Sequence, residues 1–150
     1  MTASPYHPGD FVWCAFPQRE APARPGPQHL AYTLVVLDPT ASAPGALLAA
    51  YTTSRPWPAN AAPPLGVYRF DRQEAAALGQ ARAFVLDARR IAYLPITPLW
   101  FPHLGHPGGG VQGRAPKPLQ RSIWTVAEDL LTRHAELVEK LGPLWTSRPR

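Results

Sequence analysis

Proline is the residue that most restricts the fold of this chain. Twenty of its 150 residues are proline and 11 are glycine, and they divide the apolar sequence into short pieces. Proline fixes φ and removes a backbone donor, so neither long helices nor central strands run through such segments. Hydrophobic residues still make up 45% of the chain, which is typical of a globular core. The pattern predicts a β-rich fold of the α+β class with short elements and long, stiff loops.

Several short apolar segments predict the strands. Phe11–Phe16 is apolar at every position, which predicts burial of both faces, as in a central strand of a small closed barrel. Asp71–Gly79 predicts a short helix, because Asp71 and Glu74 have the spacing of a capping box. The other predicted strands are Tyr32–Leu37, Leu47–Ala50, Gly66–Phe70 (an edge strand), Ala83–Leu86 and Ile91–Ile96.

The C-terminal third predicts one longer helix. Apolar residues recur at helical spacing from Leu119 to Leu141, and Gly142-Pro143 then ends the pattern. Asp129–Arg133 and Glu136–Lys140 have the i,i+4 spacing of helical ion pairs. The predicted organisation is a β-barrel over residues 1–104, a Gly/Pro-rich linker over 105–118, and a helix over 119–141. This helix packs either on the barrel or on a second subunit.

Charge and cysteine content restrict the function classes. The formal net charge is +5, with a pI near 9.9, which is compatible with a polyanionic partner. The single cysteine, Cys14, excludes a disulfide within the chain and is expected to be a buried apolar residue. The sequence contains neither a signal-peptide pattern nor an apolar stretch of membrane-spanning length. We therefore expect a cytoplasmic protein without membrane association.

The segment Leu47–Pro58 combines a buried strand with polar groups at its end. After Leu47–Ala50 come Tyr51, the hydroxyls of Thr52, Thr53 and Ser54, the cation Arg55, and Pro-Trp-Pro. Hydroxyls donate to phosphate oxygens and an arginine can bind two of them at once, so this strand end suits a phosphate. The alternative is that the hydroxyls cap their own backbone before a proline turn.

Four segments, in order along the chain, carry a family resemblance: Pro8–Trp13 (PGDFVW), Phe16–Glu20 (FPQRE), Leu34–Val36 (LVV) and Tyr51–Ser54 (YTTS). They resemble the first strand, first mobile loop, second strand and Thr-Ser strand end of the PemK/MazF-like toxins of bacterial toxin–antitoxin systems. Phe84–Asp87 and Arg89–Phe101 are similar to the closing strands of one branch of that family. The likeness spans residues 8–101.

The resemblance implies a fold, an activity and partners. The family fold is a small, strongly curved β-barrel with appended helices, usually a homodimer. The implied activity is cleavage of single-stranded RNA by attack of the ribose 2′-hydroxyl, without metal or cofactor, and a cognate antitoxin blocks it. By position, the catalytic threonine of the family is Thr53, with Ser54 as a second donor. Arg55, Arg24 and Thr52 are the expected RNA-binding residues, together with Trp57, which could stack on a base or instead fill the core.

The chain departs from the family at one functional position. Members carry Arg-Pro just before the second strand, whereas this chain has Leu30-Ala31-Tyr32-Thr33 there. His29 could replace that arginine as general acid or base, because imidazole exchanges protons near neutral pH, and Arg19 could supply the charge. Otherwise the chain is a non-catalytic barrel that binds RNA or protein. A gyrase-directed poison acting through residues 145–150 is a third possibility.

His103 and His106 have the spacing of a metal motif. They lie in a Pro/Gly-rich loop, with no cysteine or carboxylate close in sequence. A zinc site needs further ligands of that kind, so no metal is predicted.

Overall fold

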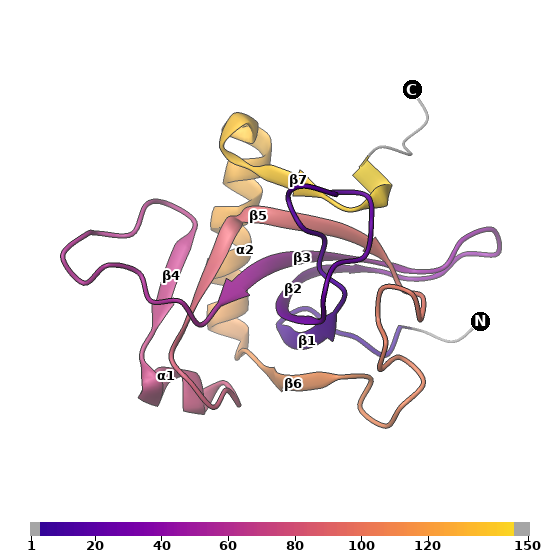
Figure 1. Ribbon diagram of the computed structural model, residues 1–150, viewed down its shortest axis with the longest axis horizontal. Helices are drawn as coiled ribbons and strands as arrows, with labels where there is room; N and C mark the ends of the chain where they lie inside the picture. The colour runs from indigo at the N-terminus through magenta and orange to yellow at the C-terminus, as the bar shows by residue number, and fades with distance from the viewer. Residues whose placement is uncertain (1–3, 146–150) are drawn as a thin grey trace.

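The computed structural model describes residues 4–145 and forms a mixed α/β fold built on one sheet (Figure 1). Its strands are β1 (Asp10–Cys14), β2 (His29–Leu37), β3 (Ala46–Thr53), β4 (Val67–Phe70), β5 (Phe84–Pro95), β6 (Val111–Arg114) and β7 (Glu139–Leu141). Its helices are α1 (Arg72–Ala77) and α2 (Lys117–Arg133), followed by short 3₁₀ turns at Ala135–Leu137 and Pro143–Trp145.

The strands pair in the order β4-β5-β3-β2-β1-β6, and each of these pairs is antiparallel. The short β7 lies parallel to β5 and pairs with its residues 90–92. Within residues 4–145 no pairing joins β4 to β6, so the predicted closed barrel is wrong and the sheet is open. The β-rich character is confirmed.

Both faces of the sheet are covered, as the apolar segment Phe11–Phe16 predicts. Phe11 lies in a core cluster with the buried residues of α2, and Val12 and Cys14 lie in a second cluster on the other face. That second cluster contains Trp100 and Phe101, from the segment after β5. Because successive residues of a strand point to opposite faces, an entirely apolar strand requires both layers.

Helix α2 packs on the sheet through one apolar stripe. Ile123, Ala127 and Leu130 are fully buried in the core cluster shared with β2 and β5. The predicted ion pair of Asp129 with Arg133 forms, with an N···O distance of 3.5 Å. Packing on this chain's own sheet therefore accounts for the buried face of the helix.

The helix ends at Arg133, eight residues before the predicted end at Leu141. The segment beyond it makes a 3₁₀ turn and then β7, whose backbone pairs with β5. An open strand edge offers unpaired N–H and C=O groups, and β7 satisfies them where β4 does not reach. Leu141 is still buried, but as part of a strand, so the apolar pattern predicted burial without determining the element.

Two further boundaries differ from the sequence prediction. The strands predicted at 83–86 and 91–96 are one long strand, β5, with a bulge between its pairings to Tyr51 and Ala50 of β3. The predicted linker 105–118 contains β6, which pairs with β1. Gly113 makes this path possible, because its φ is +140° and a Cβ there would collide with the carbonyl of Leu78.

The predicted capping box of the short helix is confirmed. Asp71 Oδ1 accepts from the backbone N of Glu74 at 2.8 Å, and Glu74 Oε1 accepts from the backbone N of Asp71 at 2.9 Å. The edge position of β4 is also confirmed. Because β4 pairs with the first residues of β5, β4 and α1 lie close to the end of β3, where the candidate site is found.

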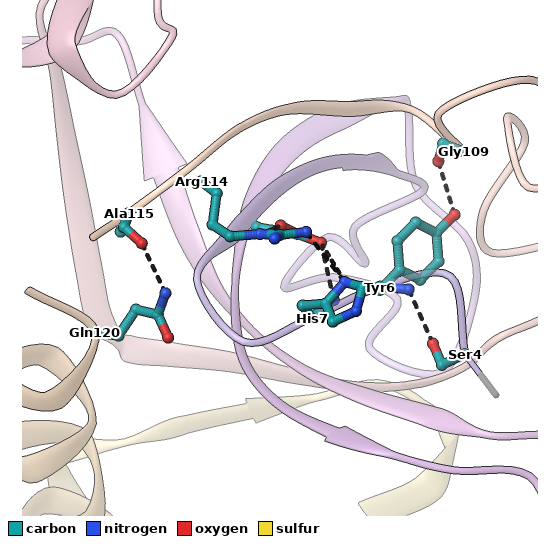
Figure 2. Close-up of polar contacts among 8 residues, drawn as sticks. Ser4, Tyr6, His7, Gly109, Arg114, Ala115 and Gln120 are labelled. Atoms are coloured by element: carbon teal, nitrogen blue, oxygen red, sulfur yellow. Dashed lines mark hydrogen bonds and ion pairs between the residues drawn. The ribbon is translucent and has the colours of Figure 1, made fainter. Parts of the chain in front are cut away.

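An ionic cluster around one buried carboxylate ties the start of β1 to β6. Asp10 is fully buried; Arg114 Nε donates to its Oδ1 at 2.5 Å, and the backbone N of His7 donates to its Oδ2 at 2.8 Å. Arg114 also donates to His7 Nδ1 at 3.0 Å (Figure 2). We call Asp10, His7 and Arg114 the Asp10 clasp. Its pairing compensates the desolvation of the carboxylate.

Candidate functional site

The start of β2 and the end of β3 meet at one edge of the sheet. The antiparallel register pairs Ala31 with Tyr51, and its continuation brings His29, the first residue of β2, opposite Thr53, the last of β3. Side chains at a strand end lie near the surface and are not packed between two layers, so polar groups there can contact a ligand. This register is what brings together residues 24 positions apart.

His29, Thr53 and Ser54 line one cavity of about 320 Å³. Trp13 and Leu30 form part of its wall, and the segment Gln80–Phe84, just before β5, forms another part. This segment contributes the exposed Arg82. We call this space the His29–Thr53 cavity. It contains an imidazole, two hydroxyls and a guanidinium, the groups that a phosphodiester can engage.

The hydrogen bond of His29 assigns its tautomer. Its Nε2 lies within hydrogen-bond distance of the backbone carbonyl of Thr52. A carbonyl oxygen only accepts, so Nε2 carries the proton of the neutral ring and Nδ1 keeps a lone pair. The ring also stacks on Tyr51, with centroids 4.8 Å apart and planes 5° from parallel. His29 is thus held by two contacts, and its Nδ1 accepts no hydrogen bond from residues 4–145.

The three hydroxyls at the end of β3 differ in what they can still bind. Thr52 is buried, and its Oγ1 donates to the carbonyl of Leu30 at 2.5 Å, so it joins β3 to β2. Thr53 is half-buried, and its Oγ1 accepts from the backbone N of Arg55 at 3.1 Å, so its own proton can be donated. Ser54 is exposed. Thr53 and Ser54 are therefore the donors available to a ligand.

A second cavity, of about 280 Å³, lies on the other side of His29. Arg19, Tyr51 and Arg90 line it, and His29 lines it as well as the first cavity. Arg90 lies over the Tyr51 ring, 4.4 Å from its centroid. We call this space the Arg19–Arg90 cavity. His29 forms the wall that the two cavities share.

Glu139 of β7 holds both arginines of that cavity. Its Oε2 pairs with Arg19 Nε at 2.6 Å, and its Oε1 accepts from Arg90 Nε at 2.8 Å. The loop between β1 and β2 lies beside β7 (Figure 1), where Pro22 accepts a backbone hydrogen bond from Gly142. These two contacts, with β7 and with the residue after it, fix the loop that carries Arg19, which lines the same cavity as His29.

Not every predicted site residue converges on these cavities. Arg24 and Arg55 are exposed, and neither lines either cavity. Trp57 lines a third cavity, described below. Sequence reasoning missed Arg82 and Arg90. Arg82 directly precedes the predicted strand Ala83–Leu86, and Arg90 directly precedes Ile91–Ile96. No local sequence pattern distinguishes these two arginines from other surface arginines.

The two loop histidines do not form a larger cluster. Their ring centroids are 5.7 Å apart, and His103 Nε2 contacts Gln28 Oε1 at 3.0 Å. Across residues 4–145, no group of three or more His, Cys, Asp or Glu side chains is placed to hold a metal ion.

No protein-family model matches this chain, and no curated protein matches its sequence. In the part of the chain that the structure describes, neither helix is long and apolar enough to cross a bilayer. Of the segment 145–150 considered for gyrase inhibition, all but Trp145 lies outside the described residues.

Proposed function

We propose that this protein is a metal-independent endoribonuclease that cleaves single-stranded RNA, in the manner of the PemK/MazF-like toxins. The observation that carries the proposal is the shared cavity: His29, Thr53 and Ser54 line the same 320 Å³ space. A proton acceptor next to two hydroxyl donors is the minimum set for transfer at a phosphodiester. Neither group would need a metal ion for this chemistry.

The geometry suggests a role for each group. His29 Nδ1 removes the proton of the ribose 2′-hydroxyl, and the 2′-oxygen attacks phosphorus. The bond from phosphorus to the 5′-oxygen breaks, and the imidazolium returns the proton to that leaving oxygen. The products are a 2′,3′-cyclic phosphate and a free 5′-hydroxyl. Thr53 and Ser54 donate to the phosphorane oxygens, where charge develops.

Arginines near this cavity can replace the family's missing Arg-Pro. Arg82 lines the His29–Thr53 cavity, and it forms no ion pair with any described residue. Arg19 and Arg90 lie across His29 in the adjoining cavity. A guanidinium at either position would attract the RNA backbone and stabilise the transition-state charge. Of the three, Arg82 is the arginine that lines the same cavity as Thr53 and Ser54.

The remaining parts of the proposal follow from the family resemblance. They are a growth-inhibiting toxin of a toxin–antitoxin system, a homodimer, a cytoplasmic location and inhibition by a cognate antitoxin. The net charge of +5 supports a polyanionic ligand. Purification with a neighbouring small acidic protein, encoded beside this chain, would test the antitoxin.

A second candidate is a non-catalytic RNA- or protein-binding module. One observation favours it: Glu139 engages both Arg19 and Arg90, so the net charge of that cavity is lower than its arginines suggest. A site that binds without cutting needs no free cation at the scissile phosphate. The same experiment separates the two candidates.

The test compares wild type with Thr53→Ala for growth arrest on overexpression and for cleavage of single-stranded RNA in EDTA. Thr132→Ala is the matched control, because Thr132 lies on α2 and donates only to Glu128 within the helix. The nuclease proposal expects wild type and Thr132→Ala to cut and Thr53→Ala to lose both effects while remaining folded. Wild-type cleavage in Thr53→Ala rejects the site, and binding without cleavage in the wild type favours the second candidate.

A further inference from the structure

A third cavity, of about 400 Å³, adjoins the His29–Thr53 cavity. Ser54, Ala83 and Phe84 line both, so the two spaces share a wall. A volume in this range accommodates a small organic ligand such as a nucleobase. An RNA strand with its phosphate at Thr53 and Ser54 would therefore place a neighbouring nucleotide at this cavity.

Aromatic side chains form part of the wall of the third cavity. Phe84 stacks on Phe70, with centroids 4.8 Å apart and planes 19° from parallel. Trp57 also lines the cavity, and Arg89 lies 5.9 Å from the centroid of its ring. Arg89 is itself fixed by two 2.9 Å bonds to Asp87. Unstacked RNA bases bind on such aromatic faces.

Two acidic residues, each held by the capping box, line the same space. Asp71 and Glu74 line the cavity, and the capping box occupies one oxygen of each. Their second oxygens, Oδ2 and Oε2, have no hydrogen-bond partner among the described residues. These oxygens accept hydrogen bonds and repel phosphate, so they select the donor edge of a base rather than the RNA backbone.

The cavity also contains a donor. Arg69 lies on β4, is exposed, and lines the space together with the two carboxylates. Guanine presents adjacent donors at N1 and N2 and adjacent acceptors at O6 and N7. Carboxylates match the first pair and arginine matches the second. Adenine, cytosine and uracil each lack one of these pairs, so guanine is the base that uses both kinds of wall.

We propose that the third cavity is a guanine subsite, which sets the RNA sequence that this protein selects. The proposal rests on the proposed function for its placement beside the scissile phosphate. The recognition itself depends on Asp71, Glu74 and Arg69 and requires no cleavage. Binding and cleavage can therefore be tested separately.

The experiment measures binding of fluorescein-labelled 2′-O-methyl heptanucleotides, which cannot be cleaved, by fluorescence anisotropy. The probes are seven uridines, and the same strand with guanine, inosine or adenine at the centre. We expect the guanine strand to bind wild type about tenfold more tightly than the adenine strand. Inosine lacks the N2 donor, so its strand should bind with intermediate affinity.

The decisive variant is Asp71→Asn/Glu74→Gln, because both replacements retain capping ability and leave the helix intact. We expect it to lose the tenfold guanine preference, while its affinity for the uridine strand stays at least as high as that of wild type, because two charges that repel phosphate are removed. Glu128→Gln, a matched substitution on α2, should keep the preference. Equal binding of all four strands by wild type, or an unchanged preference in the double variant, would overturn the subsite.

Two further measurements separate the sources of failure. Displacement of the guanine strand by free GMP at equal affinity would assign the cavity to free nucleotides and overturn the RNA subsite. Guanine preference in a protein that cleaves no RNA keeps the subsite and removes the nuclease. Cleavage of the all-ribose strands without any base preference keeps the nuclease and removes the subsite.

Discussion

The Asp10 clasp and the His29–Thr53 cavity both combine an arginine and a histidine with oxygen-bearing side chains, but they differ in how many hydrogen-bonding positions are already used. In the clasp, a fully buried carboxylate receives bonds from Arg114 and from the backbone of His7. At the cavity, His29 and Thr53 each use one hydrogen-bonding position and keep another. Complete pairing in a buried place stabilises the fold, whereas retained capacity at an open place is available to a ligand. Substitutions should separate these two roles.

The largest effect on stability is expected at Arg114. Arg114→Ala leaves the Asp10 carboxylate buried without its cation, which costs about 3 kcal/mol of unfolding free energy. We take the lower end of the usual range because the Arg114 side chain is itself 52% exposed. Urea unfolding measures the change. Arg82→Ala, the matched arginine at the cavity, should change stability by less than about 0.5 kcal/mol, and an equal cost for both would erase the distinction.

The opposite behaviour is expected at His29. His29→Ala removes the proposed base and should lower the rate of RNA cleavage about 100-fold. The lost bond to the Thr52 carbonyl should reduce unfolding free energy by about 1 kcal/mol. Single-turnover cleavage and urea unfolding give the two values. His106→Ala, in an exposed loop, is the control, and a similar loss of rate there would remove His29 from the mechanism.

Alkaline pH should lower the free energy of unfolding through Tyr6, which lies close in sequence to the Asp10 clasp. Burial, with smaller effects from Cys14 and Asp10, raises the pKa of Tyr6 from 10.0 to about 12. The unfolded chain therefore loses this proton first, so the stability is complete below pH 10 and declines as pH rises toward 12. One pKa unit corresponds to 1.36 kcal/mol, so up to about 2.7 kcal/mol is lost over this two-unit interval.

Tyr6→Phe removes the titrating hydroxyl and its bond to the Gly109 carbonyl. The variant should start less stable at pH 9 and lose less stability between pH 9 and 11.5 than wild type. Burial also raises the pKa of Tyr32 and Tyr68, so the slope should decrease without vanishing. An identical slope in the variant would show that Tyr6 titrates as it does in the unfolded chain.

The smallest effect is expected at Glu139, which joins the loop of Arg19 to β5. Glu139→Gln weakens two partly exposed ion pairs and should reduce stability by about 1 kcal/mol or less. It also frees two guanidinium groups beside His29, so RNA affinity should rise about threefold at low salt and less at high salt. Glu136→Gln, on a carboxylate that is 72% exposed, is the matched control. Unchanged RNA affinity would place the RNA elsewhere.

Part of this fold could be predicted because its signals are local. The capping box of Asp71 and Glu74 determines α1 within four residues, and the uniformly apolar segment Phe11–Phe16 requires cover on both faces. The apolar spacing of α2 likewise predicted the residues that are buried against the sheet. His29, Thr53 and Ser54 were candidates from sequence, because their side chains carry the chemistry.

The tertiary structure decided everything that depends on distant pairing. The apolar pattern after Arg133 continues at helical spacing, yet β5 offers an open edge and β7 pairs with it instead. Arg82 and Arg90 reach the site through the sheet register, which no local pattern of those residues reveals. Helix caps and apolar periodicity depend on residues a few positions apart, so they can be recognised in the sequence. A strand edge can pair with any segment of the chain, so its partner is determined only by the tertiary structure.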